Sequence, residues 1–122
     1  MYLKGQCSER IAENHLIKKD YEILFKNKRF GRYEVDLVCE KNEVIVFVEV
    51  KSLSSTRHKM PHDSVNRSKQ KKIIKVADHL LQNYFPNREC RFDVISIIGQ
   101  PEKHQIEHIK NAFTPEINNQ YF

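Results

Sequence analysis

Two carboxylates and a lysine in the middle of the sequence have the residue types and the spacing of a cation-binding site. Asp36 lies within one apolar run, and Glu49 and Lys51 lie near the end of the next. Two carboxylates that face each other in a partly dry site cannot both stay ionised without a positive neighbour. A divalent cation such as Mg²⁺ meets this need, because it binds through one or two carboxylates and keeps several waters. In the alternative, Lys51 alone neutralises the acids in a structural salt-bridge ladder, and the spacing by itself favours this alternative.

The two apolar runs predict a β-hairpin that would bring these groups together. A polar break separates the runs, and a two-residue turn at 42–43 would place Asp36 directly opposite Glu49. The same register places Glu34 opposite Lys51. Alternation along each strand then gathers all four charged residues on one face, near one end of the hairpin. The opposite face is expected to be wholly apolar and buried, and it consists of Val35, Leu37, Val44, Val46, Val48 and Val50.

Glu9 is a further acidic candidate. The periodicity of apolar residues predicts an amphipathic helix over Ser8–Lys19, and a start as early as Lys4 stays open. Glu9 falls on the same apolar stripe as Ala12 and Leu16. An inward carboxylate is unusual, but an acid near a helix N-terminus also suits the helix dipole. The spacing therefore leaves a functional and a structural explanation equally open.

Lys69 occupies a comparable position on a second predicted helix. This helix is expected over roughly Val65–Phe85, with Asp63 or Ser64 as its N-terminal cap. Lys69 interrupts the apolar stripe near the start of the helix. A lysine at such a place is expected to reach an acidic group, whereas the other cations of the helix are typical of a solvated face.

The remaining elements complete an α/β pattern. Strands are expected over Tyr21–Phe30 and Arg91–Ile98, and a short strand over Gln105–Ile109 follows a turn at 99–101. The predicted order is helix, three strands, helix, strand and short strand. A helix that links the third and fourth strands forms a right-handed parallel crossover, which gives a mixed central sheet flanked by helices.

The length and the composition are typical of a single domain. The chain of 122 residues has 39% hydrophobic and 30% charged residues, without repeats or low-complexity tracts. We expect one domain over 1–122, with a core over about 4–113 and a loose tail over 114–122. No apolar run approaches the roughly 18 residues that cross a membrane, and no signal-peptide core begins the sequence.

The cysteines and the charge suggest a compartment and a partner. Three cysteines, at positions 7, 39 and 90, lack metal-ligand spacing and favour a reducing compartment, so cytoplasm is expected. A net charge of +5 and a pI near 9.1 suit a polyanionic partner. Whether the chain forms a homodimer stays open.

Several motifs in the same order resemble a known superfamily. The chain is similar to the PD-(D/E)xK restriction-endonuclease-like nucleases, more closely to the YraN-like family of uncharacterised bacterial proteins, and also to archaeal Holliday junction resolvases. The matching residues are Gly5–Arg10 with Glu9, Glu34–Val38, Phe47–Lys51, Lys69 and Arg91–Val94. The resemblance covers nearly the whole chain, from about Lys4 to Phe113, and it reverses the preference for the salt-bridge ladder. It implies a restriction-endonuclease-like αβββαβ core.

The resemblance also implies residue roles. Asp36 and Glu49, with the Val50 carbonyl, would hold Mg²⁺ or Mn²⁺. Lys51 would approach the attacking water or the phosphate. Glu9 would hold a second ion or its water shell, and Lys69 would support the transition state or the carboxylates. Ser8, Tyr33 and Leu53 depart from the family pattern at positions that bear on substrate fit and loop conformation.

Basic residues around this site are expected to hold a nucleic-acid backbone without reading sequence. The predicted contacts are Arg10, Lys28, Arg29, Arg32, Arg57, Lys59, Arg67, Lys71 and Lys72. The favoured function is a metal-dependent nuclease acting on DNA, including branched or damaged DNA in repair or recombination. The alternatives are a nucleic-acid-binding protein that keeps the nuclease fold without turnover, and a purely structural charge ladder.

Overall fold

The computed structural model describes residues 2–53 and 66–115, with side chains from residue 7 onward in the first range. In chain order the helices and strands are α1 (Tyr2–Lys18), β1 (Glu22–Phe30), β2 (Tyr33–Lys41), β3 (Val44–Leu53), α2 (Arg67–Tyr84), β4 (Cys90–Gln100) and β5 (Lys103–Phe113).

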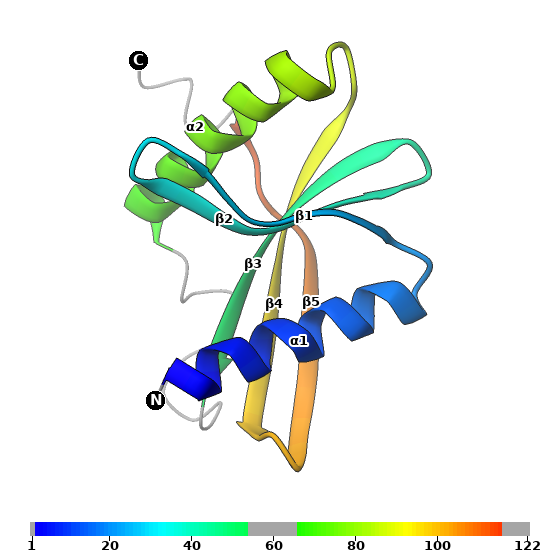
Figure 1. Cartoon of the computed structure of the whole chain (residues 1–122), viewed down its shortest axis with the longest axis vertical. Coiled ribbons are helices and arrows are strands. Elements are labelled where there is room, and N and C mark those ends of the chain that lie inside the picture. The colour runs from blue at the N-terminus through cyan, green and yellow to red at the C-terminus, as the bar shows by residue number, and fades with distance from the viewer. Residues whose placement is uncertain (1, 54–65, 116–122) are drawn as a thin grey trace.

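The strands form one five-stranded sheet in the order β1-β2-β3-β4-β5. Strands β3 and β4 are parallel, and the other neighbouring pairs are antiparallel. Helix α2 supplies the crossover between the two parallel strands, and Figure 1 shows α1 and α2 on opposite sides of the sheet. The predicted α/β class, the αβββαβ order and the mixed central sheet flanked by helices are therefore confirmed.

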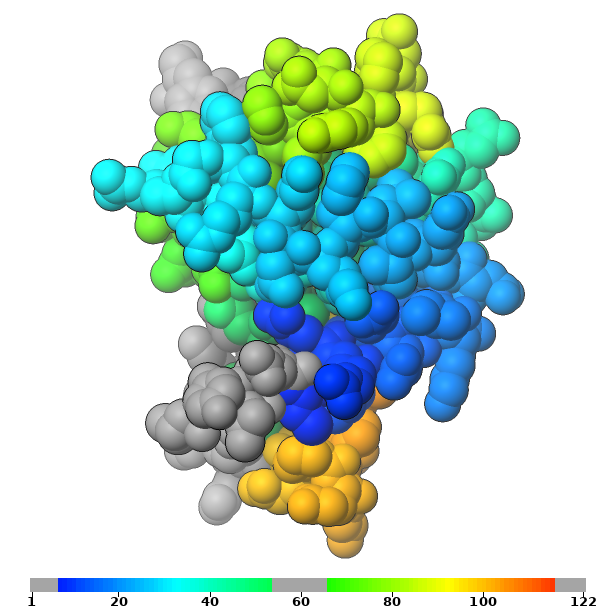
Figure 2. Space-filling model, in the orientation of Figure 1, coloured from blue at the N-terminus to red at the C-terminus, as the bar shows by residue number. Residues whose placement is uncertain are grey.

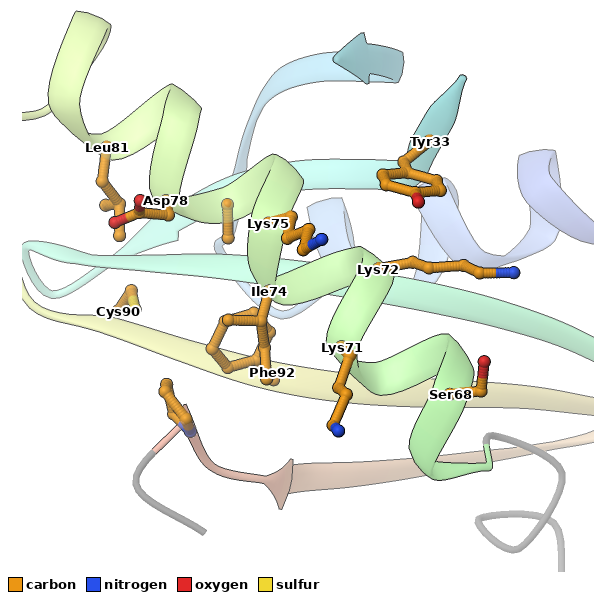
Figure 3. Close-up of a pocket in the computed structure, with 12 residues that line it drawn as sticks. Tyr33, Ser68, Lys71, Lys72, Ile74, Lys75, Asp78, Leu81, Cys90 and Phe92 are labelled. Atoms are coloured by element: carbon orange, nitrogen blue, oxygen red, sulfur yellow. The ribbon is translucent and has the colours of Figure 1, made fainter. Parts of the chain in front are cut away.

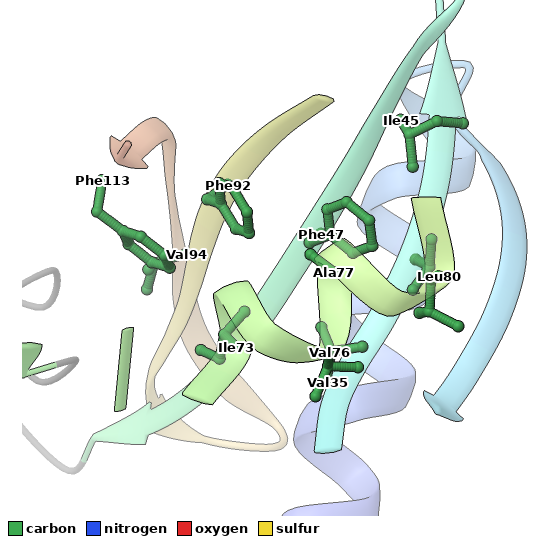
Figure 4. Packing of buried hydrophobic residues seen from close by; sticks show 11 residues of the cluster. Val35, Ile45, Phe47, Ile73, Val76, Ala77, Leu80, Phe92, Val94 and Phe113 are labelled. Atoms are coloured by element: carbon green, nitrogen blue, oxygen red, sulfur yellow. The ribbon is translucent and has the colours of Figure 1, made fainter. Parts of the chain in front are cut away.

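Each face of the sheet has its own hydrophobic cluster. The cluster beneath α2, shown in Figure 4, contains Val35, Val38, Ile45, Phe47, Ile73, Val76, Ala77, Leu80, Phe92, Val94 and Phe113. The cluster beneath α1 contains Ala12, Leu16, Tyr21, Leu37, Cys39, Val46, Val48, Ile95 and Ile97. Both faces of the central strands are thus buried, as expected for strands that read as nearly continuous apolar runs.

The hairpin of β2 and β3 has the predicted register. The described pairs run from Lys41 with Val44 to Leu37 with Val48. Both turn residues, Asn42 and Glu43, have positive φ values of 52° and 69°, as a type I′ turn requires. This two-residue turn fixes the register, so Asp36 and Glu49 lie where the ladder between the two strands ends.

The predicted apolar face of the hairpin is wrong at Val35. This residue is buried beneath α2, whereas Leu37 and Val48 pack beneath α1. Beyond Leu37, β2 continues its pairing with β1, where Lys28 lies opposite Val35. The two strands bend together over α2, as Figure 1 shows, and this tertiary packing overrides the simple alternation.

Two element boundaries differ from the predictions. Helix α2 begins at Arg67 and not near residue 65, because Asn66 is its cap and the Asn66 side-chain oxygen accepts the Lys69 N–H at 2.9 Å. The expected caps, Asp63 and Ser64, lie outside the described residues. Helix α1 extends back to Tyr2, beyond the earliest predicted start.

Strand β5 is also much longer than predicted. It spans Lys103–Phe113 and pairs antiparallel with β4 over most of its length. Gly99 lies inside β4 at φ 113°, where an added Cβ would come within 2.7 Å of the Lys103 carbonyl oxygen. The close return of the chain therefore requires glycine here, and the turn lies later than predicted, at 101–102.

Within residues 2–53 and 66–115, no helix has both the length and the apolar character needed to cross a membrane.

Candidate metal centre and nucleic-acid interface

Asp36 and Glu49 lie together in an open pocket of about 580 Å³. Strand β2 supplies Asp36 and β3 supplies Glu49. Helix α2 forms another wall of the pocket and supplies Lys69. The lining residues are Arg32, Tyr33, Glu34, Asp36, Glu49, Asn66, Ser68, Lys69, Lys72 and Ile73. Three of the predicted catalytic residues therefore share one solvent-connected hollow, and their side chains come from three different elements.

Asp36 is held by the edge of the neighbouring strand. Its Oδ2 accepts the backbone N–H of Val50 at 2.8 Å. Burial raises the pKa of Asp36 to about 7, and the nearby charge of Glu49 adds to this effect. The Val50 hydrogen bond and Lys69 oppose the increase without cancelling it. A carboxylate in this state gains from any cation that approaches the pocket.

Glu49 is nearly fully buried and makes two contacts with lysines. Its Oε2 lies 2.5 Å from Lys69 Nζ and 3.8 Å from Lys51 Nζ. The side chain of Glu49 is only 4% exposed, against 22% for Lys51 and 42% for Lys69. Lys69 therefore reaches an acidic group, as the sequence predicted for a lysine on the apolar stripe of this helix.

The two lysines have opposite pKa shifts. Burial and the adjacent Lys69 ammonium lower the pKa of Lys51, although the two carboxylates oppose this change. Burial acts to lower the pKa of Lys69, but its hydrogen bond to Glu49 and the nearby charges of Glu49 and Asp36 together raise it. Lys69 is thus the more firmly protonated of the pair, and Lys51 loses its proton more readily than an ordinary lysine.

Glu9 lies near this site but outside its pocket. It lines a separate hollow of about 310 Å³ on the α1 side of β2, together with Arg10, Lys26 and Leu37. Its charge still contributes to the raised pKa of Asp36. Glu9 is therefore an electrostatic neighbour of Asp36, and the structure does not bring it into the hollow that Asp36 and Glu49 share.

Glu34 has a different partner from the one predicted. Its Oε1 lies 3.1 Å from Arg29 Nε across the β1–β2 pair. The expected pairing with Lys51 is wrong, because β2 follows β1 and not β3 beyond Leu37. Glu34 nevertheless lines the pocket of Asp36 and contributes to its acidic rim.

The predicted basic contacts fall into several groups. Arg32 and Lys72 line the pocket of Asp36, and Arg10 lies beside Glu9. Lys71 and Lys72 also line an adjoining groove of about 650 Å³, which Figure 3 shows along α2. Of the remaining predicted contacts, Lys28 and Arg29 lie on β1 and Arg67 lies at the start of α2. Arg57 and Lys59 lie outside the described residues.

A charged cluster that was not predicted from the sequence lies on the other face of the sheet. Asp93 is fully buried there, and Arg91 donates to both of its oxygens at 2.8 and 2.9 Å. His108 Nε2 lies 2.7 Å from Asp93 Oδ2, and the Asn111 N–H donates to Oδ1 at 3.0 Å. Burial would raise the pKa of Asp93, but these hydrogen bonds lower it. The available signal was Arg91 two residues before Asp93 in an apolar strand, because such residues lie on one face.

The donor set of the pocket is suited to Mg²⁺ or Mn²⁺. Two carboxylates converge, and burial together with the charge of Glu49 raises the pKa of Asp36. Among the described residues, no group of three or more His, Cys, Asp or Glu side chains has the geometry of a metal site. Two carboxylates are nevertheless sufficient for Mg²⁺, which keeps several waters as its remaining ligands.

Sequence comparisons place the chain among related bacterial proteins. It is 43% identical over 113 residues to a UPF0102 protein of Clostridium beijerinckii, and the alignment covers 89% of this chain and 91% of that protein. It is 36% identical over 115 residues to a UPF0102 protein of Bacteroides fragilis, which covers 94% of this chain and 95% of the relative.

A comparison with solved structures finds Pyrococcus furiosus SfsA in complex with Ca²⁺. The match has a TM-score of 0.34 and 16% sequence identity, and it covers 89% of this chain and 63% of that one. The sequence model of the uncharacterised protein family UPF0102 matches residues 8–97, from α1 through most of β4. The chain therefore belongs to the UPF0102 family, as its resemblance to the YraN-like proteins implied.

Proposed function

We propose that this protein is a metal-dependent nuclease that hydrolyses phosphodiester bonds in DNA. The observation that carries the proposal is the convergence of Asp36 and Glu49 in one open pocket, with two lysines directed at Glu49. A structural ion pair needs no such opening to solvent. A hydrolytic site needs it, because both the water and the phosphate must enter.

Asp36, Glu49 and the backbone carbonyl of Val50 would hold the cation. The Val50 N–H points to Asp36, and in an extended strand the N–H and C=O of one residue point to the same side. A bound Mg²⁺ or Mn²⁺ supplies an activated water and stabilises the negative charge of the phosphate. Lys69 already contacts one oxygen of Glu49, so the protein itself supplies part of the compensating charge.

The two lysines are suited to different tasks. Lys69 stays protonated beside Glu49, and its Nζ can stabilise the charge that develops on the phosphate oxygens. Lys51 Nζ lies 3.8 Å from the same carboxylate oxygen, and its lowered pKa suits it to take up a proton from the attacking water. Arg32 and Lys72 at the rim would hold the DNA backbone without reading sequence.

A cleavage panel tests the proposal. Purified protein is incubated with duplex, single-stranded and four-way DNA in Mg²⁺, in Mn²⁺ or in EDTA. We expect cleavage in at least one metal, and a loss of roughly 100-fold or more in Asp36→Asn and Glu49→Gln. Glu102→Gln, an exposed acid in the β4–β5 turn, is the matched control and should cleave normally. If neither metal supports cleavage of any substrate, the nuclease proposal fails.

The contact between Lys69 and Glu49 favours a second candidate function. Because this ion pair neutralises Glu49 without a metal, the same fold and pocket would also suit a protein that binds DNA and does not cleave it. Such a protein binds DNA with steep salt dependence, since binding releases the counterions of the phosphates. Salt-sensitive binding without cleavage in either metal would identify this function. If Asp36→Asn changes only the free energy of unfolding, the acids form a structural ladder.

A further inference from the structure

The tip of the β1–β2 hairpin carries an exposed aromatic ring. Phe30 is 43% exposed, and one face of its ring stacks on His79 of α2 with ring centroids 4.1 Å apart and an interplanar angle of 16°. Gly31 follows at φ 64° with nothing within 4 Å of an added Cβ, so the turn stands free of the body. In Figure 2 the hairpin tip, in cyan, projects beside α2.

Cations lie along the hairpin tip and beside the neighbouring Tyr33 ring. The segment 28–33, which reads KRFGRY, contains three cations, two aromatic rings and no acid. Lys72 and Lys75 of α2 both lie 5.9 Å from the centre of the Tyr33 ring. Arg29 shares its charge with Glu34, so the other cations give the tip most of its positive potential.

The tip is continuous with the pocket of the two acids. Arg32 and Tyr33 close the turn after Phe30, and both line the pocket that contains Asp36 and Glu49. A strand whose phosphate enters the pocket would therefore pass its neighbouring nucleotides over the tip. Charge complementarity favours a nucleic-acid strand over an apolar protein surface as the occupant, because the cations and the exposed ring lie side by side.

We infer that Phe30 stacks on an unpaired base of the DNA strand whose phosphate occupies the pocket. This inference rests on the proposed function and specifies its substrate as DNA with unpaired nucleotides beside the cleaved bond. In an intact duplex the faces of the bases are covered by their neighbours, so a ring at a hairpin tip finds no free base. A single strand, a flap or a branch point offers one.

The inference is tested by binding without metal, so that cleavage plays no part. Fluorescence anisotropy in EDTA compares three labelled DNA probes, which are a single strand, a blunt duplex and a duplex with a single-stranded flap. Phe30→Ala should weaken binding to the single strand and the flap by roughly 5- to 150-fold, which corresponds to base–aromatic stacking of about 1–3 kcal/mol. Binding to the duplex should stay within about twofold of the wild type.

Matched variants separate stacking from charge and from folding. Phe30→Tyr keeps a flat ring and should retain affinity, whereas Phe30→Leu keeps apolar bulk and should lose it. Arg32→Ala should weaken all three probes alike and lower the salt slope by about 1. Ile17→Ala removes another exposed apolar side chain, 51% exposed on α1, and should change nothing.

Three results would overturn the inference. These are an equal loss on duplex and single strand in Phe30→Ala, no loss on any probe, and a dimer in analytical ultracentrifugation that Phe30→Ala dissociates. The last result would assign the ring to a second copy of this chain. Because the probes bind in EDTA, failure of metal-dependent cleavage leaves this test intact. If Phe30→Ala cleaves normally and binds DNA as the wild type does, the stacking inference fails and the nuclease proposal stands.

Discussion

Each face of the sheet holds an acid removed from solvent, Asp93 fully and Asp36 partly, and the surroundings of the two acids differ. On the α1 face, Asp93 accepts hydrogen bonds from the Arg91 side chain and the Asn111 backbone and lies 2.7 Å from His108, and these contacts lower its pKa. On the α2 face, Asp36 faces a second acid, and burial raises its pKa to about 7. An acid whose charge is compensated by hydrogen bonds stabilises the fold, whereas an acid whose charge is only partly compensated can still bind a ligand.

The largest expected effect distinguishes the two faces by stability. Asp93→Asn should lower the free energy of unfolding by about 3 kcal/mol, because it leaves the buried part of Arg91 without its counter-charge. Asp36→Asn should leave stability unchanged or increase it, since it removes repulsion with Glu49. Urea unfolding at pH 7 measures both. Equal losses in the two variants would contradict the comparison.

The pH dependence of stability should have opposite signs on the two faces. The folded-state pKa of Asp36 lies above its unfolded value of 3.8, at about 7, so the folded protein binds the extra proton. Stability from this group is therefore lost as pH rises from about 4 to about 7. Asp93 has a lowered pKa, so its contribution is present above pH 4 and is lost as pH falls below that value.

Unfolding of Asp36→Asn in EDTA across this range isolates the first effect. Relative to this variant, the wild type should lose about 2 kcal/mol between pH 4 and pH 7, a value reduced to allow for solvent screening in the open pocket. A parallel pH dependence in the two proteins would show that Asp36 titrates normally. That result would remove the electrostatic reason for a cation at this place.

Metal addition should affect only one face. Mg²⁺ at ten times its dissociation constant should stabilise the wild type by about 1.4 kcal/mol, and EDTA should reverse the gain. Glu49→Gln should abolish this response, because it removes one of the two carboxylates. Arg91→Lys, which perturbs the α1 face, should keep the full response although it unfolds more easily. A response that survives in Glu49→Gln would place the ion elsewhere.

The smallest effect concerns Ser96, which lies on β4 opposite Lys51. Its fully buried hydroxyl has no hydrogen-bond partner among the described residues. Ser96→Ala removes this unsatisfied group and should stabilise the protein by up to about 1 kcal/mol in metal-free buffer. A loss of stability in the same urea experiment would show that the hydroxyl has a hydrogen-bond partner in solution.

The part of the site that could be predicted from sequence depends on short-range structure. The turn at Asn42 and Glu43 and the alternation of the two strands give the register, and the register brings Asp36 to Glu49. Lys69 could be predicted because a cation on an apolar helical stripe near its start requires an acid. These inferences use only periodicity, turn length and the energetic cost of unpaired charge.

The rest depends on tertiary contacts that a single sequence does not display. The partner of Glu34 and the face of Val35 follow from the bend of β1 and β2 over α2. The position of Glu9 in a separate hollow depends on how α1 lies across the sheet. The cluster around Asp93 joins groups 70 residues apart, since the Tyr21 hydroxyl accepts a hydrogen bond from Arg91.

The tight hairpin turn also determines the order in which the charges can meet during folding. Asp36 and Glu49 belong to one local hairpin, whereas Lys69 reaches them only after the long parallel crossover closes between β3 and β4. Local hairpins form faster than contacts that must close long loops. The two acids therefore approach each other with Lys51, on the same strand as Glu49, beside them, before the Lys69 ammonium arrives. Until then, protons and dissolved cations supplement Lys51 in relieving their repulsion, so ionic conditions act on this chain during folding.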